Sequence, residues 1–251
     1  MPALDTDRHL VLFDIDGTLL RSEGVGVGAM LRAFARIHGD RGFSFDGIEI
    51  AGALDGLLFQ RVMAHHGLPA DEGAHERFRR VYHEELAASF TPERVRRMPG
   101  MVELARGLSE RGVATGLLTG NYRETALIKV AVAGYDLAHF PFGAFGADGP
   151  SRRHLTPIAI ERATVHHGRL FEPGFVTVIG DTPLDVDCAK AHGCRSLAVG
   201  TGPYSADALR TAGADLAVAD LSDHGAALGW ILGEDAADRA TAARLGQNAR
   251  R

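Results

Sequence analysis

Short apolar runs alternate with longer amphipathic segments along most of this 251-residue chain, and this alternation restricts the fold more than any other feature of the sequence. Each run is mostly apolar and is bounded by Gly, Asp or Thr, as is typical of buried strands in a parallel sheet. Strands and helices in alternation need right-handed crossovers, so the sequence predicts a doubly wound α/β sheet with a Rossmann-like core. The predicted strands are His9–Phe13, Val113–Leu118, Phe175–Ile179 and Arg195–Val199.

Four segments of this core have Leu, Ile, Val and Ala at helical spacing. Pro157 and Pro183 are predicted to begin two of these helices. The N–H groups of the first helical turn donate no intrahelical hydrogen bond, so a proline there removes none. The predicted helices are Val102–Glu110, Glu124–Ala133, Pro157–His167 and Pro183–His192.

Residues 21–97 differ from the rest of the chain because they contain three helical stretches and no good strand. They predict a helical domain inserted into the α/β core, which takes residues 1–20 and 98–232. The glycine-rich run 24–28 is expected to be a flexible stalk into that domain, since it lacks the preceding strand and the spacing of a phosphate loop. Residues 233–251 have few large apolar side chains and predict a tail or a peripheral helix. The three helical stretches are Val27–His38, Leu54–His66 and Asp71–Ser89.

Charge and composition exclude several classes of protein. Lys plus Arg number 27 and Asp plus Glu number 32, which leaves a formal net charge of −5 and no basic field for nucleic acid. No apolar run approaches the ~20 residues of a membrane span, and the N-terminal residues lack the apolar stretch of a signal peptide. Two cysteines make no disulfide framework. We therefore expect a cytoplasmic protein that binds neither nucleic acid nor a membrane.

Polar side chains follow three of the predicted strands, at the edge of the sheet where doubly wound proteins bind their ligands. Asp14 and Asp16 follow the first strand, Thr119–Asn121 follows the second, and Asp181 and Asp185 follow the third. The fold therefore predicts that four carboxylates, a threonine hydroxyl and several glycine-flanked amides meet at one place.

Carboxylates gathered in this way repel one another unless a cation neutralises them. Asp14 and Asp16 are two residues apart, so both can face the same side near the end of a strand. Oxygen ligands at a partly hydrated site suit Mg²⁺ better than zinc. A metal there would attract a phosphate, whose oxygens the amides of Gly120 and Asn121 and the hydroxyl of Thr119 could bind.

Three motifs at these strand ends resemble those of the haloacid dehalogenase superfamily. DIDGTLL resembles the first motif, LLTGN the second and IGDTPLDV the last, in the same order and with a helical insertion after the first. The resemblance covers roughly residues 9–220. It implies the fold of that superfamily, with residues 21–97 as a C1-type cap domain.

The resemblance also implies roles for individual residues. Asp14 would be the nucleophile that forms an aspartyl-phosphate, and Asp16 would protonate the leaving oxygen and then activate water. Thr119 would hold a phosphoryl oxygen, and Thr18, Gly120 and Asn121 would contact the substrate.

The metal ligands follow from the same resemblance. A carboxylate oxygen of Asp14, the main-chain carbonyl of Asp16 and the carboxylate of Asp181 would bind Mg²⁺. Asp185 would orient that shell. The alternative for Asp185 is a helix N-cap, a common place for aspartate.

The family's third-motif lysine has no counterpart by position, since the chain has only Lys129 and Lys190. Lys129 lies in the middle of the helix after the second motif and Lys190 lies after the last motif, so neither fits. Arg152 is expected to replace it, because a guanidinium keeps its charge and reaches phosphate with a fork. Arg153 and His154 are alternatives, and a solvated surface loop is the other interpretation.

The function that these features favour is a Mg²⁺-dependent phosphatase that acts on a small phosphorylated metabolite. A phosphomutase remains an alternative, as does a non-catalytic binding module. Asp16 and Asp181 argue against a 2-haloacid dehalogenase, which needs no metal, and the absence of lysine from residues 21–97 argues against a phosphonate hydrolase that uses a cap lysine. Asp55, in a loop expected to reach the site from the cap, would contact the substrate and disfavour a strongly anionic leaving group.

Overall fold

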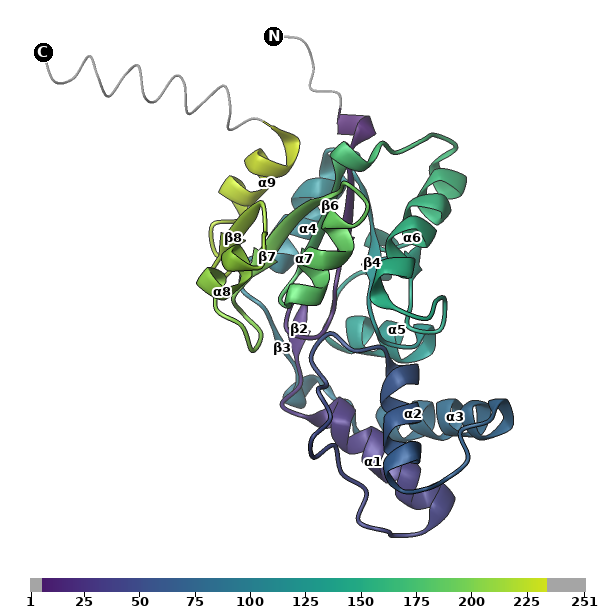
Figure 1. The fold of residues 1–251 in the computed structure, drawn as a ribbon. Coiled ribbons are helices and arrows are strands. Elements are labelled where there is room, and N and C mark those ends of the chain that lie inside the picture. Colours follow the sequence, from purple (N-terminus) through teal and green to yellow (C-terminus); the bar gives the residue numbers. More distant parts are fainter. Residues whose placement is uncertain (1–5, 234–251) are drawn as a thin grey trace, which may run out of the picture.

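A six-stranded parallel sheet forms the centre of the computed structural model, which describes residues 6–233. The strand order is β5-β4-β1-β6-β7-β8, so the chain starts in the middle of the sheet and builds outward in both directions (Figure 1). This is the predicted doubly wound α/β fold. The strands are β1 (Leu10–Phe13), β4 (Ala114–Leu118), β5 (Gly143–Ala144), β6 (Val176–Gly180), β7 (Arg195–Val199) and β8 (Leu216–Val218).

Helices cover both faces of the sheet, and the alternation of side chains along β1 explains why. Val11 and Phe13 belong to the core cluster that contains α4 (Met101–Glu110) and α9 (His224–Leu232). Leu10 and Leu12 point to the other face, into the cluster with α6 and α7. An apolar residue at every position of β1 therefore buries both faces at once. The remaining helices of this part are α5 (Arg123–Val132), α6 (Arg152–His167), α7 (Pro183–Lys190) and α8 (Ala206–Thr211).

Three further helices lie together beyond the carboxyl ends of the strands (Figure 1). Their core is a stack of phenylalanines: Phe34 lies 4.4 Å from Phe78, centroid to centroid, and Phe59 lies 5.0 Å from Phe78. A short antiparallel ribbon of β2 (Leu20–Arg21) and β3 (Arg96–Arg97) connects this helical group to the sheet. The helices are α1 (Val25–His38), α2 (Asp55–His65) and α3 (Glu72–Ser89).

The start of α6 corrects one prediction. Pro157 does not begin this helix but lies inside it, since α6 begins at Arg152. A proline has no N–H, so the carbonyl four residues earlier loses its helical donor. That carbonyl belongs to Arg153, and it accepts a hydrogen bond of 2.7 Å from Nε2 of His192 instead. A partner from outside the helix thus makes the internal proline tolerable, whereas Pro183 begins α7 as predicted.

The glycine-rich run 24–28 is also not the stalk that the sequence suggested. Helix α1 begins at Val25, so Gly26 and Gly28 lie within it, and only Gly24 adopts a left-handed conformation, at the N-cap. The ribbon of β2 and β3 makes the connection in its place. The predicted tail falls largely on residues 234–251, outside the described residues. Within residues 6–233, no helix is both long and apolar enough to cross a membrane.

Candidate active site

A cavity of about 280 Å³ lies where the carboxyl ends of the central strands meet the helical group. Its floor comes from the sheet edge and its opposite wall from α1, α2, α3 and the loop before α2. The lining residues on this side are mixed in character: apolar side chains lie with Tyr82, the carboxylates of Glu23 and Asp55, and the guanidinium of Arg21. The side chains that matter below are Asp14, Asp16, Asn121, Lys129, Arg152 and Asp181 on the floor, with Met30, Asp55, Leu58 and Tyr82 on the wall.

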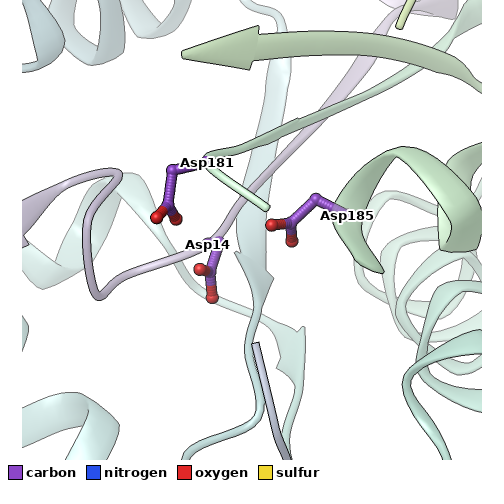
Figure 2. A group of neighbouring side chains, drawn as sticks. All are labelled: Asp14, Asp181 and Asp185. Carbon is purple, nitrogen blue, oxygen red and sulfur yellow. The ribbon is translucent and has the colours of Figure 1, made fainter. Parts of the chain in front are cut away.

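Three buried carboxylates converge at the floor of the cavity. Asp14, Asp181 and Asp185 each offer an oxygen, and these oxygens all lie within 4.8 Å of one another (Figure 2). Burial and the neighbouring negative charges raise the pKa of Asp14 and of Asp181, so the ionised form of the cluster is unfavourable without a cation. A divalent cation removes that cost, and an all-oxygen donor set is what Mg²⁺ prefers. The residues present therefore fit a magnesium ion.

The loop after β1 is shaped around Asp181. A Cβ at Gly17 would lie 2.3 Å from Oδ2 of Asp181, and one at Gly202 would lie 1.7 Å from the same atom. Both contacts are far too short, and Gly17 also has a φ of 85°, so glycine is required for the carboxylate to sit here. Thr18 is fully buried and donates a hydrogen bond of 3.0 Å to Oδ1 of Asp181. Thr18 therefore lies buried against Asp181 and does not line the cavity, whereas the sequence predicted that it contacts the substrate.

Asp185 has two sets of partners. Its Oδ2 accepts hydrogen bonds from the N–H and the hydroxyl of Thr182, which completes a capping box at the start of α7. Its Oδ1 accepts a hydrogen bond from the guanidinium of Arg152. The capping alternative that the sequence left open is thus realised, and the same carboxylate also faces Asp14 and Asp181.

Arg152 is the member of the predicted Arg-Arg-His trio that reaches this cluster. Its guanidinium lies 2.9 Å from Oδ1 of Asp14, and the two side chains are only 5% and 6% exposed. Arg153 instead lies on the surface and pairs with Asp187, while His154 contacts Ser151. The first turn of α6 therefore directs one of three candidate side chains inward.

Asp16 faces the cavity from the other side of the floor, with its side chain 44% exposed. Its Oδ2 accepts a hydrogen bond of 2.8 Å from Nδ2 of Asn121, and the same Nδ2 lies 2.9 Å from Oγ1 of Thr119. The side chain of Asn121 thus bridges the first and second motifs. Thr119 is fully buried beneath Asn121, and Gly120 lines the cavity beside it.

Sequence reasoning missed Lys129. This side chain is 5% exposed, and its Nζ lies 2.5 Å from Oδ2 of Asp16 and 2.5 Å from Oδ1 of Asn121. No helical spacing indicated this contact, because Asn121 precedes α5 (Arg123–Val132) and Lys129 lies within that helix.

The loop before α2 packs directly on the second motif. The N–H of Asp55 donates to the carbonyl of Gly120 at 2.8 Å, and Oδ2 of Asp55 accepts from the N–H of Tyr122 at 3.0 Å. A Cβ at Gly120 would lie 2.2 Å from the carbonyl oxygen of Ala53, so only glycine permits this approach. Burial raises the pKa of Asp55 to about 7. The helical group therefore brings a carboxyl into the cavity, as the sequence predicted for this loop.

The sheet is doubly wound and has an acidic cluster at the ends of its central strands. This arrangement is typical of enzymes whose catalytic groups are carboxylates. The model of the haloacid dehalogenase-like hydrolase family matches residues 11–190, and the chain belongs to this family. The resemblance of the three motifs is thereby confirmed, and the protein is a hydrolase.

Individual relatives agree with this assignment. The chain is 25% identical to a phosphoglycolate phosphatase of Mesorhizobium japonicum over 211 residues, which cover 78% of this chain and 84% of the relative. It is 26% identical to a phosphoglycolate phosphatase of Rhodospirillum rubrum over 226 residues, which cover 88% and 90%. Among solved structures, it resembles a β-phosphoglucomutase of Clostridium difficile with a TM-score of 0.63 at 16% identity, over 86% of this chain and 92% of that one. At that identity, the likeness supports the fold alone.

Proposed function

We propose that this protein is a Mg²⁺-dependent phosphatase that hydrolyses a small phosphorylated metabolite through an aspartyl-phosphate. The observation that carries the proposal is the buried pair of Asp14 and Arg152, which opens on the cavity beside Asp181. A nucleophilic carboxylate, a permanent positive charge and an oxygen-ligand cluster are the three parts that phosphoryl transfer needs.

The first chemical step transfers the phosphoryl group to Asp14. A carboxylate oxygen of Asp14 attacks phosphorus, and the bond from phosphorus to the leaving oxygen breaks. Asp16 gives its proton to that oxygen, which leaves as an alcohol.

The second step restores the enzyme. Asp16, now a carboxylate, takes a proton from a water molecule that attacks phosphorus, and the bond from phosphorus to Asp14 breaks. Inorganic phosphate leaves, Asp14 is again a carboxylate, and Asp16 again carries a proton.

Fixed charges stabilise the phosphoryl group during both steps. Arg152 lies beside the attacking carboxylate, and the amides of Gly120 and Asn121 line the same floor. Mg²⁺, when bound by Asp14, Asp181 and the main-chain carbonyl of Asp16, supplies further positive charge to the phosphoryl oxygens. Since hydrogen bonds engage both carboxylate oxygens of Asp185, we assign it to orienting this shell and Arg152.

The helical group acts as the cap in this proposal, with residues 21–97 as its extent and residues 1–20 and 98–232 as the core. The contact of Asp55 with Gly120 holds it against the phosphate-binding loop. A closed cap excludes water from the reacting groups and selects the leaving group.

A small substrate fits the observations. The cavity measures about 280 Å³, and the relatives from Mesorhizobium japonicum and Rhodospirillum rubrum are both phosphoglycolate phosphatases. The leaving-group side contains Asp16, Asp55 and the ammonium of Lys129. The charge of Asp55 disfavours a strongly anionic group only as the pH rises through its pKa of about 7. Neutral and anionic phosphate esters of similar size therefore belong together in the substrate panel, with 2-phosphoglycolate among them.

The test is a panel of metabolite phosphates and an aryl phosphate, assayed with Mg²⁺ and with EDTA. We expect phosphate release that needs Mg²⁺. Isomerisation of a sugar phosphate without phosphate release would favour a phosphomutase, and metal-free release of chloride from 2-chloropropionate would favour a dehalogenase. Binding of phosphate esters with no turnover of any of them would favour a non-catalytic module.

A further inference from the structure

Lys129 is a buried cation that the proposed mechanism does not use. It lies on α5, its side chain is 5% exposed, and the chain contains just one other lysine, Lys190. An ammonium group loses its hydration on burial. It is therefore buried only where hydrogen bonds and opposite charges from the protein replace the lost water. The partners of Lys129 are Oδ2 of Asp16 and Oδ1 of Asn121, each at 2.5 Å.

These partners bind one carboxylate oxygen of Asp16 and leave its other oxygen without a hydrogen bond in the described residues. Oδ2 of Asp16 accepts hydrogen bonds from both Nζ of Lys129 and Nδ2 of Asn121. Within residues 6–233, Oδ1 of Asp16 is in no hydrogen bond or ion pair, and the side chain remains 44% exposed on the cavity side. Lys129 and Asn121 therefore hold Oδ2 of Asp16, whereas Oδ1 is left available to a group bound in the cavity.

We infer that Lys129 is a positioning residue for Asp16: it holds Oδ2 so that Oδ1 carries the proton toward the leaving oxygen. This inference rests on the proposed function, in which Asp16 is the general acid. Negative charge develops on Asp16 as the proton departs, and a fixed ammonium beside Oδ2 stabilises that charge without reorganisation. Lys129 should therefore affect the rate of the first step, in which Asp16 protonates the leaving oxygen.

Gly26 of helix α1 lies beside this arrangement, at a distance where a Cβ would make ordinary contact. A Cβ at Gly26 would lie 3.5 Å from Nζ of Lys129 and 3.9 Å from the hydroxyl of Tyr82. A larger side chain at this position would reach into the space beside the ammonium and the cavity. The absence of a side chain at Gly26, a residue unfavourable inside a helix, keeps that space open.

The dependence of the rate on the leaving group separates positioning from mere support of the fold. An alkyl alcohol is a poor leaving group and needs the proton of Asp16, whereas p-nitrophenolate leaves without one. The quantity kcat/KM covers the steps through departure of the leaving group. Loss of a positioning residue for the acid therefore lowers kcat/KM for alkyl phosphates and spares p-nitrophenyl phosphate, whereas a damaged fold lowers both.

The experiment compares Lys129→Met with Lys190→Met in the full chain with Mg²⁺. Lys190 is the matched control because it pairs with Asp215 on the surface. We expect Lys129→Met to lower kcat/KM for the best alkyl phosphate of the panel about 10- to 100-fold and for p-nitrophenyl phosphate less than about 3-fold. The loss on the alkyl phosphate should not exceed the lower end of the ~10²- to 10⁴-fold that a general acid supplies, because Asp16 itself is still present. Lys190→Met should change neither. An equal loss on both substrates, or no loss on either, would overturn the inference.

A second comparison covers the case in which Lys129→Met fails to fold with an unpaired Asp16. In the double variant Asp16→Asn with Lys129→Met, both charges are gone. Its ratio of alkyl to aryl kcat/KM should equal that of Asp16→Asn alone, because Lys129 acts through Asp16; a further drop in the ratio would overturn the inference. If the wild-type protein releases phosphate from no ester, the proposed function itself fails, which is a distinct result.

Discussion

The two sides of the candidate site are built in different ways. The phosphoryl side, made of Asp14, Arg152, Asp181 and Asp185, is deeply buried and comes entirely from the sheet and from the helices behind it. The leaving-group side is made of Asp16, Asn121, Lys129 and Asp55. The last three are buried as well, but the side chain of Asp16 is 44% exposed, and the helical group supplies Asp55.

The difference indicates that the two sides of the site have different functions. On the phosphoryl side, Arg152 touches two carboxylates, so its charge is placed before any substrate arrives. On the leaving-group side, the wall depends on the position of Asp55 against Gly120. The first side therefore sets the chemistry, and the second sets which ester fits and how its alcohol departs. Each prediction below tests one side against the other.

The largest effect is expected at the nucleophile. Asp14→Asn replaces a carboxylate with an amide that cannot attack phosphorus, so kcat should fall by roughly 10³-fold or more on every substrate. The amide is similar in size, so thermal unfolding should show a folded protein. Retention of wild-type turnover by Asp14→Asn would contradict the aspartyl-phosphate mechanism.

Removal of the buried arginine should come next. Arg152→Ala takes one fixed charge from the phosphoryl group, and kcat should fall about 10²- to 10³-fold, alike for aryl and alkyl phosphates. The Mg²⁺ concentration that gives half-maximal rate should change little. Arg153→Ala is the control, because Arg153 pairs with Asp187 on the surface, and its kcat should match the wild type. If the control loses activity and Arg152→Ala does not, the assignment on α6 is wrong by one residue.

Asp55 should alter selectivity and not the chemistry. Asp55→Asn keeps an oxygen for the N–H of Tyr122 but removes the negative charge. We expect the ratio of kcat/KM for 2-phosphoglycolate to that for a neutral polyol phosphate to rise about 3- to 10-fold. Asp46→Asn, at an exposed position of the helical group, is the control. Identical ratios in Asp55→Asn and the wild type would remove Asp55 from substrate selection.

The smallest effect concerns metal binding and pH. Burial raises the pKa of Asp14 and of Asp181, so protons compete with Mg²⁺ for these oxygens at neutral pH. As the pH rises through the raised pKa, the protons leave and Mg²⁺ binds more tightly. The gain in Tm on adding Mg²⁺ should therefore be larger at pH 8 than at pH 6, by a few degrees, since ~1 kcal/mol shifts Tm by ~2–4 °C at this size. A larger gain at pH 6 would show that these carboxylates do not control the metal site.

The phosphoryl side could be predicted from the sequence because its parts follow strands. Motifs at strand ends need only the sheet order to meet, and apolar runs such as that of β1 reveal the sheet. Arg152 was preferred to Arg153 and His154 because a guanidinium keeps its charge and suits phosphate, although the nearby Pro157 was wrongly expected to begin the helix. The place of Pro157 inside α6 depends on His192, which bonds the carbonyl of Arg153 from 39 residues away and which no local pattern reveals.

The leaving-group side was predicted less completely because it depends on how helices sit. Lys129 and Asp16 are 113 residues apart, and they meet only because α5 turns one face toward β1. The glycines 26 and 28 looked like a loop, yet they lie in α1, where packing overrides their low helix propensity. The strands β5 and β8 and the helices α8 and α9 were not predicted. Of these, β5, β8 and α8 have only two, three and six residues, and segments this short carry little periodic signal.

The hydrogen bond from His192 to the carbonyl of Arg153 has a consequence for local opening of the chain. It joins the first turn of α6 to the turn that follows α7, so these two segments cannot fray independently. Opening of either one would withdraw the guanidinium of Arg152 from Asp14 and Asp185. The amides at the start of α6 should then exchange with solvent at the rate of the core and not at the rate of a helix end. We therefore expect the first turn of α6, although it precedes an internal proline, to open more slowly than an ordinary helix end.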